Sequence, residues 1–177
     1  MRLTAAIVEQ PGPVALTVAG EGGTSALVLL PCDPATHGPF IRELTRANFA
    51  ALMRRTVGWD EARHRQAPRH PERYRMVCED GEPIGFFAVR EEGDALYLQT
   101  IQLVPARRGC GYDTALMGYV EQVARGRGFA AVRLRVFDEN PACAWYQRRG
   151  YRVVAAEPHS AIMERACGRD RTSSRGV

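Results

Sequence analysis

The sequence contains no lysine, and all 24 of its basic residues are arginines. With 20 acidic residues the net charge is only +4, and the arginines do not gather into the basic face expected of a nucleic-acid binder. The sequence also lacks a run of about 18 apolar residues, which a membrane-spanning helix needs. Its apolar start is interrupted by Glu9 and Pro11, so it lacks the core of a secretory signal. These absences predict a cytoplasmic protein that binds neither nucleic acid nor membrane.

Metal and disulfide chemistry lack their usual sequence patterns as well. The five cysteines are odd in number, widely spaced and never arranged as a Cys-x-x-Cys pair; they are Cys32, Cys78, Cys110, Cys143 and Cys167. Neither a disulfide framework nor a zinc site is predicted. We expect free thiols in a reducing compartment and no metal.

The length and the changes in composition predict one domain with extensions. A chain of 177 residues suffices for one substantial core. Residues 1–24 hold prolines and glycines around a short β-prone run, and the sequence leaves open whether they form an extra strand or a flexible extension. Residues 25–165 are predicted to form the domain, and residues 166–177, which lack apolar periodicity, a disordered tail.

Within the domain, the spacing of apolar residues changes between the helical and the strand period. Helices are predicted at 39–56, 112–126 and 140–149, with a short helix and a loop between 58 and 72. Strands are predicted at 26–30, 74–79, 84–90, 95–104, 132–136, 151–155 and 160–163. A three-strand meander thus leads into a strand-helix-strand unit. This order predicts an α+β fold, with a single-domain mixed, mostly antiparallel central sheet flanked by helices on both faces.

The most informative segment follows the last strand of the meander. A strand runs into a turn that contains Gly109 and Gly111, and an amphipathic helix starts at once. The free N–H groups of a helix N-terminus attract an anion, glycines let a diphosphate approach the backbone, and Arg107 and Arg108 add positive charge. A phosphate-bearing ligand is the direct inference, although a plain tight turn with solvated arginines also fits these residues.

Two other phosphate-binding motifs do not fit this turn. No Gly-Lys-Ser/Thr sequence is present, so the turn is not a P-loop. A dinucleotide-binding turn has a third glycine and an acidic residue about 20 residues further on. Here the third glycine is missing, and the acidic residue Asp138 comes later than that spacing.

Two segments resemble the GCN5-related N-acetyltransferase (GNAT) family. The coenzyme motif of that family is Gln/Arg-x-x-Gly-x-Gly/Ala; Arg108 and Gly111 match its first two defined positions, and Asp113 departs from the third. Residues 136–151 are similar to the family's strand, its Asn-rich turn and a helix that ends in Tyr-x-x-x-Gly-Phe/Tyr, here from Tyr146 to Tyr151. Both segments occur in the family's order, and the resemblance covers roughly residues 26–165.

The resemblance implies an N-acetyltransferase that uses acetyl-CoA as cosubstrate, without a metal. In this family two splayed parallel strands form the coenzyme cleft, the backbone of the earlier strand pairs with the pantetheine arm, and the turn amides hold the pyrophosphate. The residues implied to contact the coenzyme are Gln102, Leu103, Val104, Arg107, Arg108, Gly109, Cys110, Gly111, Tyr112, Asp113, Thr114, Asn140 and Tyr146.

Tyr146 corresponds to the family's general acid, which protonates the departing thiolate. A tyrosine suits this role because its pKa of about 10 keeps it protonated at neutral pH. Its place four residues before Gly150 favours this role over that of a core aromatic residue. Asn140 is predicted to cap its helix and to be near the coenzyme. Asp113 is predicted to turn away from the coenzyme and to cap the helix start.

The general base and the acceptor stay open at this stage. The last meander strand offers Tyr97, Gln99, Thr100 and Gln102, none of them a carboxylate, which leaves ordered water or a group elsewhere, such as His159. The resemblance implies that the acceptor is a primary amine on a small molecule or a peptide, which attacks the acetyl thioester directly. It also allows a homodimer. The alternative is a non-catalytic acyl-CoA-binding or regulatory module with a degenerate active site. Asp113 keeps this alternative open, because a carboxylate beside a pyrophosphate weakens binding.

Overall fold

The computed structural model describes residues 12–20, 23–64 and 68–168. Eight strands form one sheet in the order β1-β2-β3-β4-β5-β6-β8-β7. The chain divides into two compact units. The first, called the N-terminal unit, comprises Met1–Arg90 and Leu98–Leu116, and the second, called the C-terminal unit, comprises Glu91–Tyr97 and Met117–Val177.

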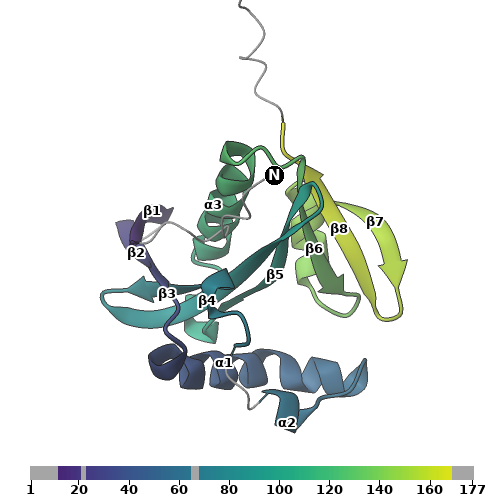
Figure 1. Ribbon diagram of the computed structural model, residues 1–177, viewed down its shortest axis with the longest axis horizontal. Coiled ribbons are helices and arrows are strands. Elements are labelled where there is room, and N and C mark those ends of the chain that lie inside the picture. The colour runs from purple at the N-terminus through teal and green to yellow at the C-terminus, as the bar shows by residue number, and fades with distance from the viewer. Residues whose placement is uncertain (1–11, 21–22, 65–67, 169–177) are drawn as a thin grey trace, which may run out of the picture. The chain divides into compact units, whose positions relative to one another are not determined.

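Among the described residues, the N-terminal unit holds three whole strands, most of two others, two helices and the turn of interest. Its elements are β1 (Val14–Gly20), β2 (Gly23–Pro31), α1 (Pro34–Arg55), α2 (Glu61–His64), a 3-10 turn (Pro71–Arg73), β3 (Tyr74–Glu79), most of β4 (Glu82–Glu92), the later part of β5 (Ala95–Leu103), a second 3-10 turn (Pro105–Arg107) and the start of α3 (Tyr112–Gly126). Figure 1 labels the helices and strands among these elements.

The run from Val14 to Gly20 forms an extra edge strand. β1 pairs antiparallel with β2 along its whole length, from Val14 opposite Leu29 to Gly20 opposite Gly23. Of the two possibilities that the sequence leaves for this segment, an extra strand or a flexible extension, the structure shows the extra strand. The rest of the predicted extension, residues 1–11 and 21–22, lies outside the described residues.

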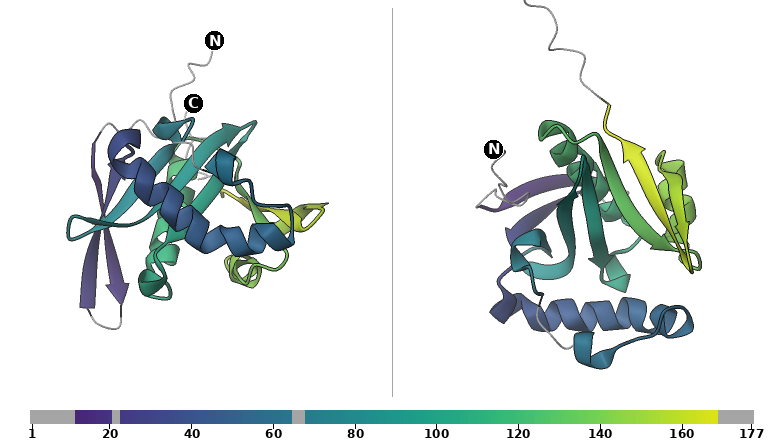
Figure 2. Two further views of the ribbon diagram at one scale, coloured as in Figure 1. Left: turned by 90° about the horizontal axis from the view of Figure 1, so that it is seen from below. Right: turned by 45° about the vertical axis from the view of Figure 1, so that its right-hand side comes forward.

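The core of the N-terminal unit lies between α1 and the strands. Ile41 and Leu44 of α1 pack with Met76, Cys78 and Phe86 from β3 and β4. Figures 1 and 2 show α1 lying along one face of these strands. Burying each of these large side chains contributes about 1.5–3 kcal/mol relative to exposure. The contact therefore fixes the position of α1 relative to the meander.

Helix α1 starts earlier than the sequence predicts. Residue 39 was the expected start, from the helix-like spacing of the apolar residues that follow it. The helix begins instead at Pro34, since the carboxylate of Asp33 accepts hydrogen bonds from the amides of Ala35 at 3.3 Å and Thr36 at 3.1 Å. Pro39 then lies inside the helix, where it removes a single backbone donor.

The β3–β4 hairpin confirms the predicted turn at residues 80 and 81. Asp80 and Gly81 have φ values of 51° and 85°, so both central residues are left-handed. Two left-handed central residues match the right-handed twist of the flanking strands, which is why Asp-Gly favours such hairpins. The turn brings the end of β3 next to the start of β4, with Glu79 opposite Glu82.

The C-terminal unit contains the last three strands. It contains the rest of α3, β6 (Ala131–Phe137), α4 (Ala142–Arg148), β7 (Arg152–Glu157) and β8 (Ser160–Ala166). β8 pairs antiparallel with both β6 and β7. The amide of Ala130 donates to the carbonyl of Asp94 at 2.8 Å, so the starts of β6 and β5 lie side by side and these neighbours are the parallel pair.

The predicted fold class, an α+β fold with a mixed and mostly antiparallel sheet, is confirmed. The strand at 74–79 has the predicted bounds, and the others differ by a few residues at their ends. Most of the predicted tail, residues 169–177, lies outside the described residues. Among the residues that are described, no helix is long and apolar enough to cross a membrane.

Candidate coenzyme and active site

The segment from Pro105 to Gly111, called the glycine turn below, joins β5 to α3. It consists of the 3-10 turn Pro105–Arg107, an extended Arg108 and two left-handed glycines, with φ of 72° at Gly109 and 82° at Gly111. A side chain at these φ values is strained, which explains the glycines. All seven residues of the turn are exposed. The predicted strand-turn-helix segment is therefore present and open to solvent.

Helix α3 begins directly after the glycine turn. Its first hydrogen bond runs from the amide of Ala115 to the carbonyl of Gly111 at 3.1 Å. The amides of Tyr112, Asp113 and Thr114 precede that bond, and Thr114 is exposed. Such amides, together with the positive end of the helix dipole, favour an anion.

Glu79 holds both sides of the glycine turn. Its carboxylate accepts a hydrogen bond from the hydroxyl of Tyr112 and another from Nε of Arg107 at 2.6 Å. The bond from Tyr112, followed by the Arg107 interaction, lowers the pKa of Glu79 below its ordinary value. The bond to Glu79 also raises the pKa of Tyr112, whose ring is buried. The Tyr112 side chain is thus an anchor, which leaves its backbone amide for a ligand.

Arg108 is held by groups that carry no charge. Its guanidinium donates to the amide oxygen of Asn48 on α1 and, at 3.4 Å, to the carbonyl oxygen of Leu103. Asn48 donates in turn to Gln102 at 3.2 Å and to the same carbonyl of Leu103 at 3.4 Å. The N-terminal unit therefore brings Gln102, Leu103 and Arg108 together at the end of β5.

Two backbone contacts limit what the end of β5 can offer a ligand. The amide of Val104 donates to the carbonyl of Ile84 at 2.9 Å, so Val104 contributes to pairing with β4. A Cβ atom on Gly85 would lie 2.3 Å from the carbonyl oxygen of Gln102. The close approach of β4 therefore requires glycine at position 85.

Asp113 does not cap α3 with its buried oxygen. In the part of the chain that the structure describes, Oδ1 of Asp113 is buried and has no hydrogen-bond partner. A capping carboxylate would accept a backbone N–H with such an oxygen. The residue does lie in the first turn of α3, where a negative charge interacts favourably with the helix dipole.

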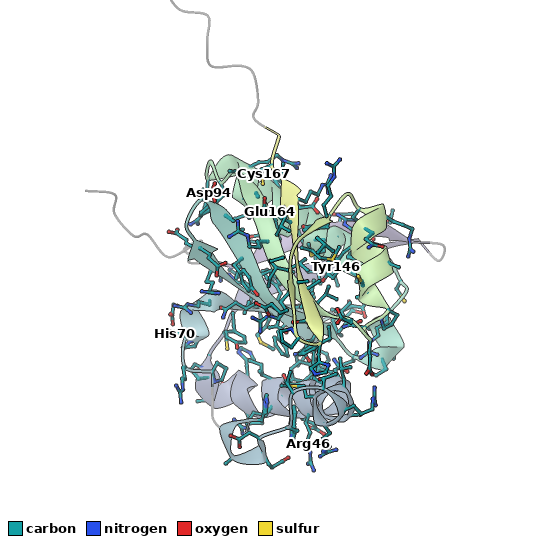
Figure 3. All side chains as sticks on the ribbon, turned by 90° about the vertical axis from the view of Figure 1, so that its right-hand side faces the viewer. Arg46, His70, Asp94, Tyr146, Glu164 and Cys167 are labelled. Carbon is teal, nitrogen blue, oxygen red and sulfur yellow. The ribbon has the colours of Figure 1, made fainter. Side chains whose placement is uncertain are left out.

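Tyr146 lies on α4 in the C-terminal unit, where Figure 3 labels it. Its side chain is 7% exposed and meets the ring of Tyr151 edge-on, with ring centres 5.5 Å apart. Trp145 contacts it in the same way at 5.0 Å. The ring is therefore fixed by its aromatic neighbours.

Glu121 of α3 forms hydrogen bonds with residues around this aromatic cluster. Its buried carboxylate accepts from the hydroxyl of Tyr151 at 3.2 Å, from Arg149 at 3.3 Å and from Arg165 at 2.7 Å. Burial, followed by the charge of Glu121, raises the pKa of Tyr151. The three bonds tie α3, the end of α4 and β8 together around Tyr146.

Asn140 caps α4 as predicted. Its Oδ1 accepts from the amide of Ala142 at 2.9 Å, and its carbonyl accepts from Cys143 at 3.0 Å. The side chain therefore satisfies one of the free amides at the helix start. Any contact of Asn140 with a coenzyme stays a prediction.

Two polar residues of β5 and two histidines, among them the candidate base His159, lie in different surroundings. Thr100 and Gln102 are hydrogen-bonded to each other at 3.1 Å. His159 is exposed, at the β7–β8 turn, with a left-handed φ of 64°. His64 stacks on Trp59 with ring centres 3.8 Å apart. Across the described residues, no three His, Cys, Asp or Glu side chains gather as a metal site would require, and all five cysteines are free.

Comparison with known proteins supplies the family. The sequence model of the acetyltransferase (GNAT) family matches residues 40–151, more than half of the chain, including the glycine turn and α4. The chain belongs to the GNAT acetyltransferase family. No curated protein sequence matches this GNAT chain significantly.

Solved structures share the fold of this GNAT chain at low sequence identity. A PaiA N-acetyltransferase from Thermoplasma acidophilum in complex with coenzyme A is 15% identical, with a TM-score of 0.61, over 79% of this chain and 98% of that one. A ribosomal-protein alanine N-acetyltransferase from Escherichia coli is 17% identical, with a TM-score of 0.61, over 85% and 99%. An N-acetylglutamate synthase from Neisseria gonorrhoeae, complexed with coenzyme A and N-acetyl-glutamate, is 15% identical with a TM-score of 0.61, over 81% of this chain and 35% of that one.

Sequence reasoning missed four residues that contact or support the candidate site residues within their own unit. Glu79, Asn48 and Glu121 lie outside the two family-like segments, and each acts through partners that are distant in sequence. Gly85 lies inside a strand, where an isolated glycine signals a close backbone approach. That signal could have identified Gly85, whereas no local pattern marks the other three.

Proposed function

We propose that this GNAT chain transfers an acetyl group from acetyl-CoA to a primary amine by direct attack. The main support for this proposal is the exposed glycine turn. Its two left-handed glycines lead into the first amides of α3, close to Arg108 in the chain. A pyrophosphate needs several converging N–H donors and little side-chain bulk, and this turn offers both. A Cβ atom at Gly109 would meet nothing within 4 Å, so the surface there is open.

The coenzyme supplies an activated acetyl thioester, and residues of the chain bind it. In the proposal, the amides of residues 108–114 bind the pyrophosphate, and the guanidinium of Arg108 adds charge. Backbone groups at Gln102 and Leu103 face the pantetheine arm. A backbone amide near Leu103 donates to the carbonyl oxygen of the acetyl group, where negative charge develops during attack.

Tyr146 is proposed as the general acid. The amine nitrogen bonds to the acetyl carbon, the carbon–sulfur bond breaks, and the phenol of Tyr146 gives its proton to the sulfur. The amine releases its own proton to water or to a base. The burial of Tyr146 among aromatic rings supports this role, because a fixed phenol loses little entropy when it donates.

The acceptor in this proposal is a primary amine on a small molecule or a peptide. Structures with the same fold include, by name, an N-acetylglutamate synthase and a ribosomal-protein alanine N-acetyltransferase, so both kinds of acceptor occur on this fold. A cytoplasmic location and a homodimer stay predictions.

A second candidate function rests on Asp113. Its buried Oδ1 lacks a partner in the described part of the chain, in the first turn of the helix that would face the pyrophosphate. Repulsion between this carboxylate and the phosphates would favour a module that binds acyl-CoA weakly without turnover.

Titration calorimetry with acetyl-CoA and kinetics of Tyr146→Phe test the proposal. We expect the wild type and Tyr146→Phe to bind acetyl-CoA with affinities within about twofold of each other. The kcat of Tyr146→Phe is expected to fall about 100-fold or more. Unchanged turnover in the variant would refute the role of Tyr146. Binding without turnover in the wild type would favour the second candidate, and the absence of binding would contradict both.

A further inference from the structure

The two arginines of the glycine turn have partners of different charge. Arg107 donates to the carboxylate of Glu79 at 2.6 Å, so the positive charge of Arg107 is compensated within the chain. Arg108 donates to the amide oxygen of Asn48 and to the carbonyl of Leu103, both of which are neutral. These contacts use two of the five N–H donors of the guanidinium. Arg108 is therefore held in place while its charge stays uncompensated by either partner.

The orientation of the Asn48 amide follows from its other contacts. Its nitrogen donates to Oε1 of Gln102 at 3.2 Å and to the carbonyl oxygen of Leu103 at 3.4 Å. A flipped amide would place an oxygen against these two acceptors and an NH₂ group against the guanidinium, which only donates. The oxygen of Asn48 must therefore face Arg108.

Gln102 is fixed in the same way. It is 5% exposed, and its amide nitrogen donates to Thr45 of α1 at 3.2 Å and to Thr100 of β5 at 3.1 Å. With the bond from Asn48, the two donors and the carbonyl of the Gln102 amide all have partners. A buried network with complete pairing is rigid. Asn48 thus connects α1 to Arg108 of the glycine turn through hydrogen bonds.

We propose that Asn48 is a positioning residue for the coenzyme, because its neutral oxygen holds Arg108 in place and leaves the guanidinium charge for the phosphates of acetyl-CoA. This inference rests on the proposed function. An aspartate at position 48 would form an ion pair with Arg108 and would lose the bonds that the Asn48 nitrogen donates to Gln102 and Leu103. An alanine would release Arg108 without changing its charge.

The test compares three variants on helix α1 by calorimetry with coenzyme A at low and high salt. Asn48→Asp is expected to weaken binding about tenfold and to flatten its salt dependence, since the charge of Arg108 is neutralised. Asn48→Ala is expected to weaken binding about threefold and to keep the wild-type salt dependence. Ala47→Asp adds a charge at an exposed neighbouring position and is expected to change binding less than about twofold.

A second readout separates charge from general loosening of the fold. S-acetylpantetheine carries the thioester without the nucleotide phosphates, so Asn48→Asp should lower its kcat/KM no more than Asn48→Ala does. An equal loss with acetyl-CoA and with S-acetylpantetheine would overturn the inference. So would wild-type coenzyme A affinity in Asn48→Asp. If the wild type itself does not bind coenzyme A, it is the proposed function that fails.

Arg108→Gln provides a variant at an exposed position, which keeps the test decisive if Asn48→Asp does not fold. The inference predicts the same loss of coenzyme A affinity and of salt dependence as in Asn48→Asp. In the double variant with Asn48→Ala the two losses should not add, because Asn48 acts through Arg108. Unchanged affinity in Arg108→Gln would contradict the inference.

Discussion

At the scale of single residues, Gly85 lies where β4 comes close to the end of β5. A Cβ atom there would lie 2.3 Å from the carbonyl oxygen of Gln102 and 2.7 Å from Cδ2 of Leu103. The first of these atoms belongs to the backbone, so it cannot rotate away. The end of β5, which is proposed to face the coenzyme, therefore keeps its position only with glycine at residue 85.

Gly85→Ala is predicted to lower the free energy of unfolding by about 1–3 kcal/mol, because β4 and β5 must move apart. Urea denaturation measures this change. Gly118→Ala is the matched control, since a Cβ at this helical glycine meets nothing within 4 Å. The control is expected to be neutral or to stabilise by up to about 1 kcal/mol. Equal stability of Gly85→Ala and wild type would show that the approach is not a constraint.

Cys110 gives a chemical probe of the glycine turn. Of the five cysteines, all of which lie in the described part of the chain, only Cys110 is exposed. Burial, with the nearby charge of Asp33, raises the pKa of Cys32 to about 11, which makes that thiol a slow nucleophile.

We predict that iodoacetamide modifies Cys110 first and that saturating acetyl-CoA, which has no free thiol to consume the reagent, slows this reaction about tenfold or more, because a ligand on the turn covers the Cys110 thiol. Mass spectrometry of the modified peptides measures the rate. Cys110→Ser removes the fast phase and serves as the control. Equal rates with and without acetyl-CoA would place the coenzyme elsewhere.

At the scale of elements, the glycine turn depends on the end of β3. Glu79 connects the turn to β3 through Arg107 and the anchor residue Tyr112. The pKa of Glu79 is lowered in the folded protein, so its contribution to stability is fully present above the ordinary carboxyl pKa of about 4.3. This contribution disappears as the pH falls through the lowered pKa.

Glu79→Gln is therefore predicted to be less stable than wild type at pH 7 by up to about 1 kcal/mol, and the difference should shrink as the pH falls below 4. Thermal unfolding across this pH range measures it. Glu43→Gln, at an exposed position of α1, is the control and should behave as wild type. A difference that stays constant with pH would contradict the carboxylate's role.

Helix α4 depends on its cap in a similar way. Asn140→Ala removes the bond to the amide of Ala142 and is predicted to cost about 0.5–2 kcal/mol. Because α4 carries Tyr146, turnover should fall together with stability. Asn140→Asp keeps the accepting oxygen and should retain both, as measured by chemical denaturation and by initial rates. Full stability in Asn140→Ala would mean that the cap contributes nothing.

At the scale of the whole molecule, the sequence predicted the backbone better than the side-chain network. The meander and α3 were predictable because their apolar residues repeat with a clear period, and the glycine turn because its conformation needs glycine. The start of α1 was missed because Asp33 caps it ahead of a proline.

The contacts of the site were not predictable in this way. Tyr112 and Glu79 are 33 residues apart, and Arg108 and Asn48 are 60 residues apart. Only the folded chain brings such partners together, and a single sequence carries no signal for their pairing. For the same reason the sequence did not predict the surroundings of Asp113. Its buried oxygen was expected to cap α3, but it accepts no hydrogen bond from the described residues.

The most direct test of acetyl transfer to an amine is an acceptor screen with acetyl-CoA. Amino acids, polyamines and short peptides with free N-termini or lysines are incubated with the purified protein, and released thiol and the mass of each amine are measured. The account predicts that at least one amine gains an acetyl group, with one equivalent of thiol released, and that Tyr146→Phe reduces both signals together. Tight binding of acetyl-CoA with no acetylated amine and no thiol release across the whole panel would contradict it.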